Sequence, residues 1–139
     1  MPSQPSKELL TVPNPYPDRE YTVTISSPEF TCLCPMTGQP DFAEIRIVYT
    51  PGPRIVELKS LKLYLWSFRN EGAFHERVIN EIMDDFVAAA DPIRIEVSGD
   101  FLVRGGLHTI VTTTYERAAH AHGNGRQAAA AQPDATSVG

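Results

Sequence analysis

Cysteine and long apolar runs are both scarce in this sequence. Its 139 residues include only two cysteines, Cys32 and Cys34, which are separated by a single residue. No apolar run approaches the roughly 20 residues that a membrane-spanning helix needs, and the N-terminus lacks the apolar stretch of a signal peptide. We therefore expect a cytoplasmic protein, in which both cysteines are thiols. The absence of a GxGxxG sequence argues against a Rossmann cofactor site.

Basic residues are also in the minority. The chain has 12 Lys and Arg against 17 Asp and Glu, which gives a net charge of −5. Nucleic-acid-binding proteins usually carry a basic excess or patch, so we expect no direct nucleic-acid partner. Hydrophobic residues make up 42% of the chain, which is typical of a globular protein of this length with one core.

Composition divides the chain into three parts. Residues 1–19 contain five prolines, which predict an irregular N-terminal arm. Residues 117–139 are low in complexity and lack core-forming side chains, so we expect a disordered tail. Residues 20–116 remain as the folded domain.

The periodicity of apolar residues changes twice within this domain. Residues 20–33 and 41–51 alternate apolar and polar side chains on either side of a turn, which predicts an antiparallel strand pair. Residues 56–70 and 73–92 place apolar side chains three and four positions apart, which predicts two helices. Residues 93–116 return to a period of two.

In this last segment we interpret Gly99 as a bulge or bend and Gly105-Gly106 as a break between two strands. The predicted order is therefore strand, strand, helix, helix, strand, strand. It indicates an α+β fold, in which two helices lie on one face of an antiparallel sheet.

The segment TCLCPMTGQPD places a thiol where a strand meets a turn. Cys34 precedes a proline and is therefore held extended, at a position where loops often carry function. A lone cysteine is commonly a small buried apolar residue, whereas a nucleophile needs a lowered pKa or a nearby base. Asp41 is either a turn residue or, if it is kept protonated, a proton donor. We expect Cys32 to face away from Cys34 and to have a packing role.

Two residues at the start of the second predicted helix are candidates for substrate binding. The acidic side chain of Glu76 suits the first turn of a helix because of the helix dipole. Alternatively, its carboxylate accepts two parallel N–H bonds, as the edge of a guanine-like base would donate. His75 is either a solvated surface residue or part of the same site.

Three basic residues are candidates for binding an anionic cofactor. Lys59 and Lys62 are three residues apart, so they share one face of the first predicted helix. That face is either a solvated basic edge or a phosphate clamp. Arg104 and the neighbouring Gly105 would extend such a clamp, because glycine lets the backbone approach a ligand closely.

Three segments together resemble a known family. PEFTCLCPMTGQPDF, VELKSLKLYLWSFRNEGAFHE and GDFLVRGG are similar to segments of the NADPH-dependent 7-cyano-7-deazaguanine reductases, the QueF family, in its short single-module form. The family signature is met at all eight positions from Glu57 to Tyr64. This resemblance implies the tunnelling fold, which the family shares with GTP cyclohydrolase I. It also implies reduction of the substrate's nitrile to an aminomethyl group with two NADPH, during biosynthesis of the tRNA base queuosine.

The resemblance further implies a role for each candidate residue. Cys34 would attack the nitrile carbon to form a covalent thioimide, Asp41 would protonate the nitrogen, and His75 would assist the proton transfer. His75 and Glu76 would contact the deazaguanine, together with backbone around Val56, Glu57 and Leu58. NADPH would be bound by Lys59, Lys62, Arg104 and Gly105.

The resemblance implies a homo-oligomer as well, a decamer of two stacked pentamers with active sites between subunits and no metal. Two alternatives stay open. One is a zinc-dependent enzyme of the GTP cyclohydrolase I type, with Cys34 and His75 as metal ligands. The other is a non-catalytic purine- or pterin-binding module that retains Glu76.

Overall fold

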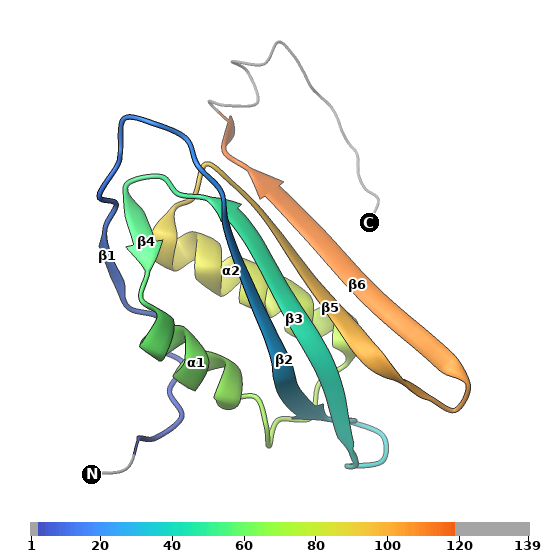
Figure 1. Ribbon diagram of the computed structural model, residues 1–139. Helices are drawn as coiled ribbons and strands as arrows, with labels where there is room; N and C mark the ends of the chain where they lie inside the picture. The colour runs from blue at the N-terminus through green and yellow to red at the C-terminus, as the bar shows by residue number, and fades with distance from the viewer. Residues whose placement is uncertain (1–2, 119–139) are drawn as a thin grey trace.

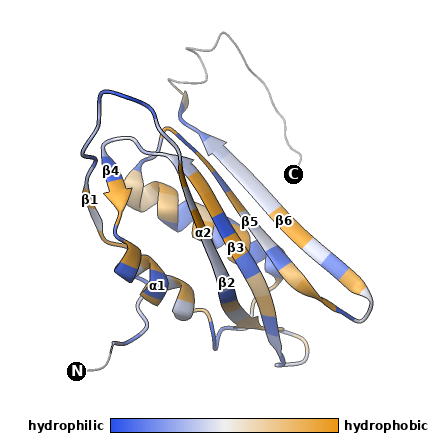
Figure 2. Cartoon of the chain, in the orientation of Figure 1, coloured by the Kyte–Doolittle hydropathy of each residue, from blue (hydrophilic) through white to orange (hydrophobic). Residues whose placement is uncertain are grey.

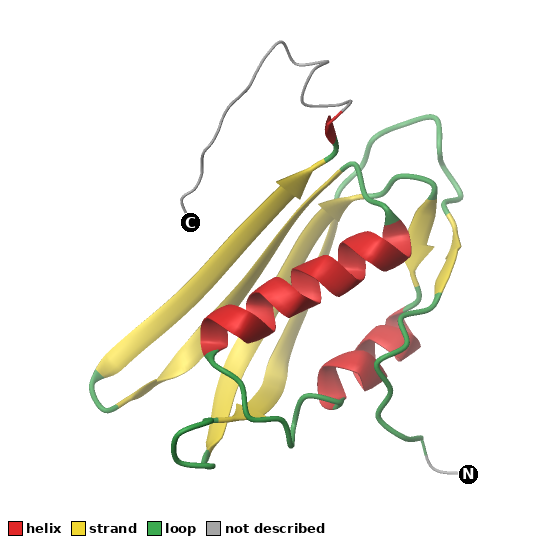
Figure 3. Cartoon of the chain, turned by 180° about the vertical axis from the view of Figure 1, so that it is seen from behind, coloured by secondary structure: helices red, strands yellow, loops and turns green. Residues whose placement is uncertain are grey.

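A four-stranded antiparallel sheet and two helices form the two layers of the molecule (Figures 1 and 3). The computed structural model describes residues 3–118. Helix α2 crosses one face of the sheet, and α1 lies on the same side near the β2 edge (Figure 3).

The predicted α+β class and element order are confirmed for this sheet. Its strand order is β2-β3-β5-β6, with β2 at Val23–Leu33, β3 at Pro40–Thr50, β5 at Arg94–Arg104 and β6 at Leu107–Glu116. The helices are α1 at Leu58–Trp66 and α2 at His75–Ala90.

The core lies between the sheet and the helices. Strand β3 buries every second residue from Ala43 to Tyr49 and exposes Glu44 and Arg46, as the alternation predicts. Figure 2 shows the same alternation as bands of opposite hydropathy along the strands. Helix α2 faces this layer with one apolar stripe, which includes Ile79 and Phe86. Burial of these complementary faces holds the two layers together.

The prediction that residues 1–19 lack a regular element is wrong in one place. Strand β1 (Thr11–Pro13) pairs with β4 (Arg54–Val56) in a separate two-stranded sheet. A proline is tolerated there because Pro13 occupies the last position of a short edge strand. The next residue, Asn14, is buried, and its side chain donates to the carbonyl of Gly52 at 2.8 Å.

Helix α1 is shorter than predicted at both ends. Glu57 caps it, because each carboxylate oxygen accepts one backbone N–H, from Lys59 and Ser60, at 2.8 Å. Val56 therefore belongs to β4, and the helix begins at Leu58. Helix α2 ends close to the predicted position, with Asp91 in the left-handed conformation (φ 49°) just before Pro92.

Gly99 is not a bulge. It pairs in regular register with Ile45 on β3 and with Val111 on β6. A Cβ at this position would lie 2.5 Å from Cδ1 of Ile79, so glycine lets α2 pack close to the sheet and any larger residue would displace the Ile79 side chain. The register shifts lie elsewhere, between Ser27 and Phe30 on β2 and between Phe101 and Arg104 on β5.

Gly105 and Gly106 do form the predicted break, as the turn between β5 and β6, with φ of 61° and 80°. The predicted disordered tail lies outside the described residues, apart from residues 117–118. Neither helix between residues 3 and 118 is long and apolar enough to cross a membrane.

Candidate active site

The loop between β2 and β3 presents Cys34. The Cys34 N–H donates to the carbonyl of Gln39, and the Gly38 N–H donates to the carbonyl of Cys34, both at 2.8 Å. Gly38 has a φ of 74°, a conformation that favours glycine. These two bonds close the loop tightly and hold the thiol at its base. Cys34 is only 7% exposed.

Asp41 begins the buried alternation of β3. Its side chain is 6% exposed, and both carboxylate oxygens have partners. Oδ2 lies 3.1 Å from Nε2 of His75, and Oδ1 lies 2.7 Å from Nη1 of Arg104. The carboxylate thus links a residue at the start of α2 to one at the end of β5.

His75 is the first residue of α2, as the sequence predicts within one turn. Its ring stacks on the buried ring of Phe101, with centroids 3.7 Å apart and an interplanar angle of 5°. This stacking and the contact with Asp41 together fix the plane and the direction of the imidazole. The role of Phe101 was not anticipated from the sequence, although the alternation of β5 places this residue on the core side.

Arg104 reaches the site because of the irregularity in β5. Strict alternation from Phe101 would turn Arg104 to the opposite face of the sheet. The register shift between these two residues returns its side chain to the face that carries Asp41. The guanidinium of Arg104 also contributes to lowering the pKa of the Cys34 thiol. The structure therefore pairs Arg104 with Asp41, and the implied role of Arg104 in NADPH binding stays a prediction.

The thiol of Cys34 is activated by its surroundings. Hydrogen bonds from the side chain and backbone of Thr37, from the backbone of Met36 and from Arg104 lower the pKa of Cys34 from 9.0 to about 7. Donors that stabilise a thiolate are typical of reactive cysteines.

Cys32 has the opposite environment. The expectation that it faces away from Cys34 is wrong, because side chains two residues apart on a strand share a face. Phe30, Cys32 and Cys34 are all buried on the core side. Burial and the charge of Asp41 raise the pKa of Cys32 to about 11, which agrees with its expected packing role.

The other candidate residues do not join this cluster within one chain. Leu58 and Lys62 line a groove of about 580 Å³ between β2 and α1, and Lys59 is exposed nearby on the same helix. Glu57 caps this helix, and Val56 is buried, with its N–H donating to the hydroxyl of Tyr49. Two more candidates, Glu76 next to His75 and Gly105 next to Arg104, are exposed at the edge of the thiol cluster.

A zinc site requires three or four ligands. Among residues 3–118 no three His, Cys, Asp or Glu side chains are grouped so that they could hold a metal ion. Cys34 and His75 are thus without a third ligand in this part of the chain. The geometry offers no support for the zinc-dependent alternative.

The fold and the cluster define a small α+β protein with an activated cysteine beside an Asp–His–Arg set. Comparison with known proteins identifies its family. Residues 40–120 match the model of the QueF-like proteins, and the chain belongs to this family. A relative from Anaeromyxobacter sp. strain K is 65% identical over 83% of this chain and 94% of its own. A relative from Thermomicrobium roseum is 62% identical over 86% and 93% of the two chains. Both are named NADPH-dependent 7-cyano-7-deazaguanine reductase.

A solved structure supports the fold assignment. The crystal structure of the archaeosine synthase QueF-Like in the apo form superposes with a TM-score of 0.63, over 67% of this chain and 91% of the other. At 19% identity this likeness concerns the fold alone. It agrees with the tunnelling fold that the sequence resemblance implied.

Proposed function

We propose that this protein is an NADPH-dependent oxidoreductase that reduces the nitrile of 7-cyano-7-deazaguanine to an aminomethyl group, in queuosine biosynthesis. Relatives at 62–65% identity carry the name of this activity and are matched over nearly their whole length. The observation that carries the proposal is the Cys34 thiol, with a lowered pKa, beside the Asp41–His75 contact. A nitrile carbon needs a nucleophile, and its nitrogen needs a proton.

Cys34 supplies the nucleophile. Its thiolate adds to the nitrile carbon and forms a C–S bond, while one π-electron pair of the nitrile moves to nitrogen. A proton from the Asp41–His75 pair completes a thioimide, which accepts hydride far more readily than a nitrile does. NADPH, when bound, supplies one hydride for each of the two reductions, so that the nitrile gains four electrons in all.

Asp41 and His75 transfer the proton to the substrate. The 3.1 Å contact between His75 Nε2 and Asp41 Oδ2 is the route by which this proton reaches the substrate nitrogen, with Asp41 as the group that delivers it. Arg104 keeps the other carboxylate oxygen in place at 2.7 Å. Arg104 also stabilises the thiolate that leaves when the reduced thioimide collapses to an imine, before the second reduction.

Substrate and cofactor binding use the remaining candidates. Glu76, one residue after His75, would accept the paired N–H groups of the deazaguanine, and backbone around Val56, Glu57 and Leu58 would complete its pocket. Lys59 and Lys62 fit an anionic dinucleotide, since both are exposed cations beside an apolar groove. Gly105 leaves room for a close approach to the cofactor, because no described atom lies within 4 Å of a Cβ at that position.

We also propose a homo-oligomer, a decamer of two stacked pentamers, in the cytoplasm, where thiols remain reduced. The separation of the β2–α1 groove from the thiol cluster supports active sites that combine two subunits. Strands β2 and β6 are the outer strands of the four-stranded sheet, where a strand of a second copy could pair. Exposed apolar side chains near the β5–β6 turn, Leu102, Val103 and Leu107, support the same assembly.

The test follows NADPH absorbance with purified protein and 7-cyano-7-deazaguanine. We expect nitrile-dependent loss of two NADPH per substrate in the wild type and in Cys32→Ala, and no loss in Cys34→Ala. Mass spectrometry should show a covalent adduct only where Cys34 is present. An intact wild-type oligomer that consumes no NADPH would contradict the proposed activity.

A further inference from the structure

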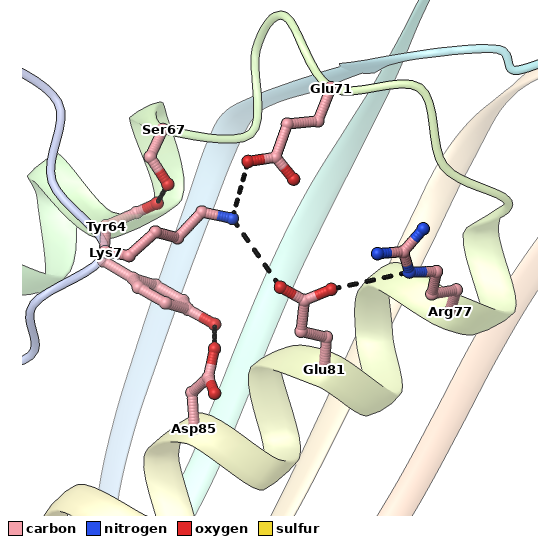
Figure 4. A network of polar contacts seen from close by, with 7 residues as sticks. All are labelled: Lys7, Tyr64, Ser67, Glu71, Arg77, Glu81 and Asp85. Atoms are coloured by element: carbon pink, nitrogen blue, oxygen red, sulfur yellow. Dashed lines mark hydrogen bonds and ion pairs between the residues drawn. The ribbon is translucent and has the colours of Figure 1, made fainter.

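Lys7, in the N-terminal arm, contacts three side chains outside the thiol cluster, and Figure 4 shows two of them, Glu71 and Glu81. Its Nζ lies 2.8 Å from Oε2 of Glu71, in the segment between α1 and α2. It also lies 3.6 Å from Oε2 of Glu81 on α2, and 3.5 Å from the centroid of the Phe68 ring. One ammonium group therefore connects the arm to α2 and to the segment that precedes it.

The arm holds Lys7 firmly. The Ser6 N–H donates to the carbonyl of Leu63 at 3.3 Å, and the Leu10 N–H donates to Oγ of Ser60 at 3.0 Å. Both acceptors lie on α1. The backbone on each side of Lys7 is thus attached to α1, so the ammonium has a defined position rather than that of a free terminal residue.

The backbone around Glu71 is hydrogen-bonded to Leu33, the residue before Cys34. The Leu33 N–H donates to the carbonyl of Glu71 at 2.9 Å, and the Ala73 N–H donates to the carbonyl of Leu33 at 3.0 Å. These bonds form a parallel bridge between Leu33 and Gly72, one residue before the thiol. Gly72 also packs beside Pro35, since a Cβ on Gly72 would lie 3.6 Å from Cα of Pro35.

The same segment, between α1 and α2, ends next to His75. Only Phe74 separates Ala73 from the first residue of α2, and Glu81 lies further along that helix. Lys7 thus connects the strip of backbone that supports Cys34 with the helix that carries His75. We propose that Lys7 is a positioning residue, which sets the placement of Cys34 relative to the His75–Asp41 pair. This inference rests on the proposed function.

We expect Lys7 to affect the geometry of the site and to contribute little to the free energy of unfolding. The side chains of Lys7, Glu71 and Glu81 are 38%, 42% and 31% exposed, so water screens their attraction. Positions of reacting groups, by contrast, affect rate steeply, and a displacement of about 1 Å can cost about a hundredfold. A partial displacement of the Leu33–Cys34 backbone should therefore reduce kcat while binding changes little.

The test compares Lys7→Met with Arg77→Met. Methionine keeps an apolar stem on Phe68 and removes the charge. Arg77 pairs with Glu81 at 3.7 Å and with no other carboxylate among residues 3–118, so it serves as the matched control. We expect Lys7→Met to lower kcat about tenfold with little change in KM, and Arg77→Met to match the wild type.

Lys7→Arg should recover most of the rate, because a guanidinium can make both ion pairs. Glu71→Gln should reproduce the loss, and the Lys7→Met/Glu71→Gln double variant should lose little more.

A purely structural role predicts a different pattern. A lower thermal midpoint with wild-type kcat in Lys7→Met, or an equal loss in Arg77→Met, would overturn the inference. If the wild type reduces no nitrile, the proposed function fails, but the inference can still be judged by iodoacetamide alkylation of Cys34. A changed pH profile in Lys7→Met and not in Arg77→Met supports positioning, and identical profiles refute it.

Discussion

Replacing Thr37 by valine should slow alkylation of Cys34 at neutral pH. Hydrogen bonding by Thr37 is the largest of the influences that lower the pKa of Cys34 from 9.0 to about 7. Valine keeps the branched shape and removes the hydroxyl, while the backbone donors and Arg104 remain. Because the lost donor stabilised the thiolate, the pKa of Cys34 rises, and the thiolate appears only at higher pH.

The magnitude follows from the difference between 9.0 and about 7. Loss of the hydroxyl raises the pKa of Cys34 toward 9.0 but not above it, because the other donors remain. At pH 7 the thiolate fraction falls from about one half toward about one hundredth, so alkylation should slow by a factor that lies between these limits. Arg104→Met should produce a smaller rise, because Arg104 contributes less than Thr37.

The assay is the rate of iodoacetamide alkylation across a pH series, with the adduct located by mass spectrometry. Cys32, whose pKa is raised to about 11, should stay unmodified near neutral pH, and Cys34→Ala should abolish the signal. A wild-type midpoint near 9, or a Thr37→Val profile that overlays the wild type, would refute the reasoning.

Two further predictions concern the packing that supports the site, and both are measured by urea denaturation at one fixed protein concentration. Gly99→Ala should lower the free energy of unfolding by about 1–3 kcal/mol, because its Cβ would lie 2.5 Å from Cδ1 of Ile79. Adding Ile79→Val, which removes that methyl group, should recover part of the loss, and strictly additive effects would contradict this account. Asn14→Ala should cost about 1–3 kcal/mol, since it deprives the Gly52 carbonyl, the Tyr16 N–H and the Tyr21 hydroxyl of a buried partner. A change below about 0.5 kcal/mol would show that water replaces these bonds.

The elements that the sequence predicted are those with strong local patterns. The alternation in β3 and the apolar stripe of α2 depend only on which side chains face the core, and both can be recognised without knowledge of the fold. Turn chemistry was equally informative, since Gly105-Gly106 and the residues before Pro92 end elements where predicted.

Features that depend on distant partners were not predictable. Strand β1 exists because Thr11–Pro13 meets Arg54–Val56, some forty residues later, and no periodicity appears in a three-residue strand. The role of Gly99 likewise depends on how closely α2 approaches the sheet. From the sequence alone, a glycine that leaves room for a neighbour cannot be distinguished from one that bends a strand.

The cluster around Cys34 contains a further contact that the sequence does not predict, at Arg104. The resemblance groups Cys34, Asp41 and His75 in one site, but it gives no sign that Arg104 contacts Asp41, because a motif gives residue types and not the direction of side chains. Since the side-chain period of a strand is two, one irregularity between Phe101 and Arg104 decides which face of the sheet receives the guanidinium. The intervening Leu102 and Val103 are both apolar and both exposed, so their pattern gives no sign of the shift. Only the paired strands show that Arg104 returns to the face of the thiol and the acid.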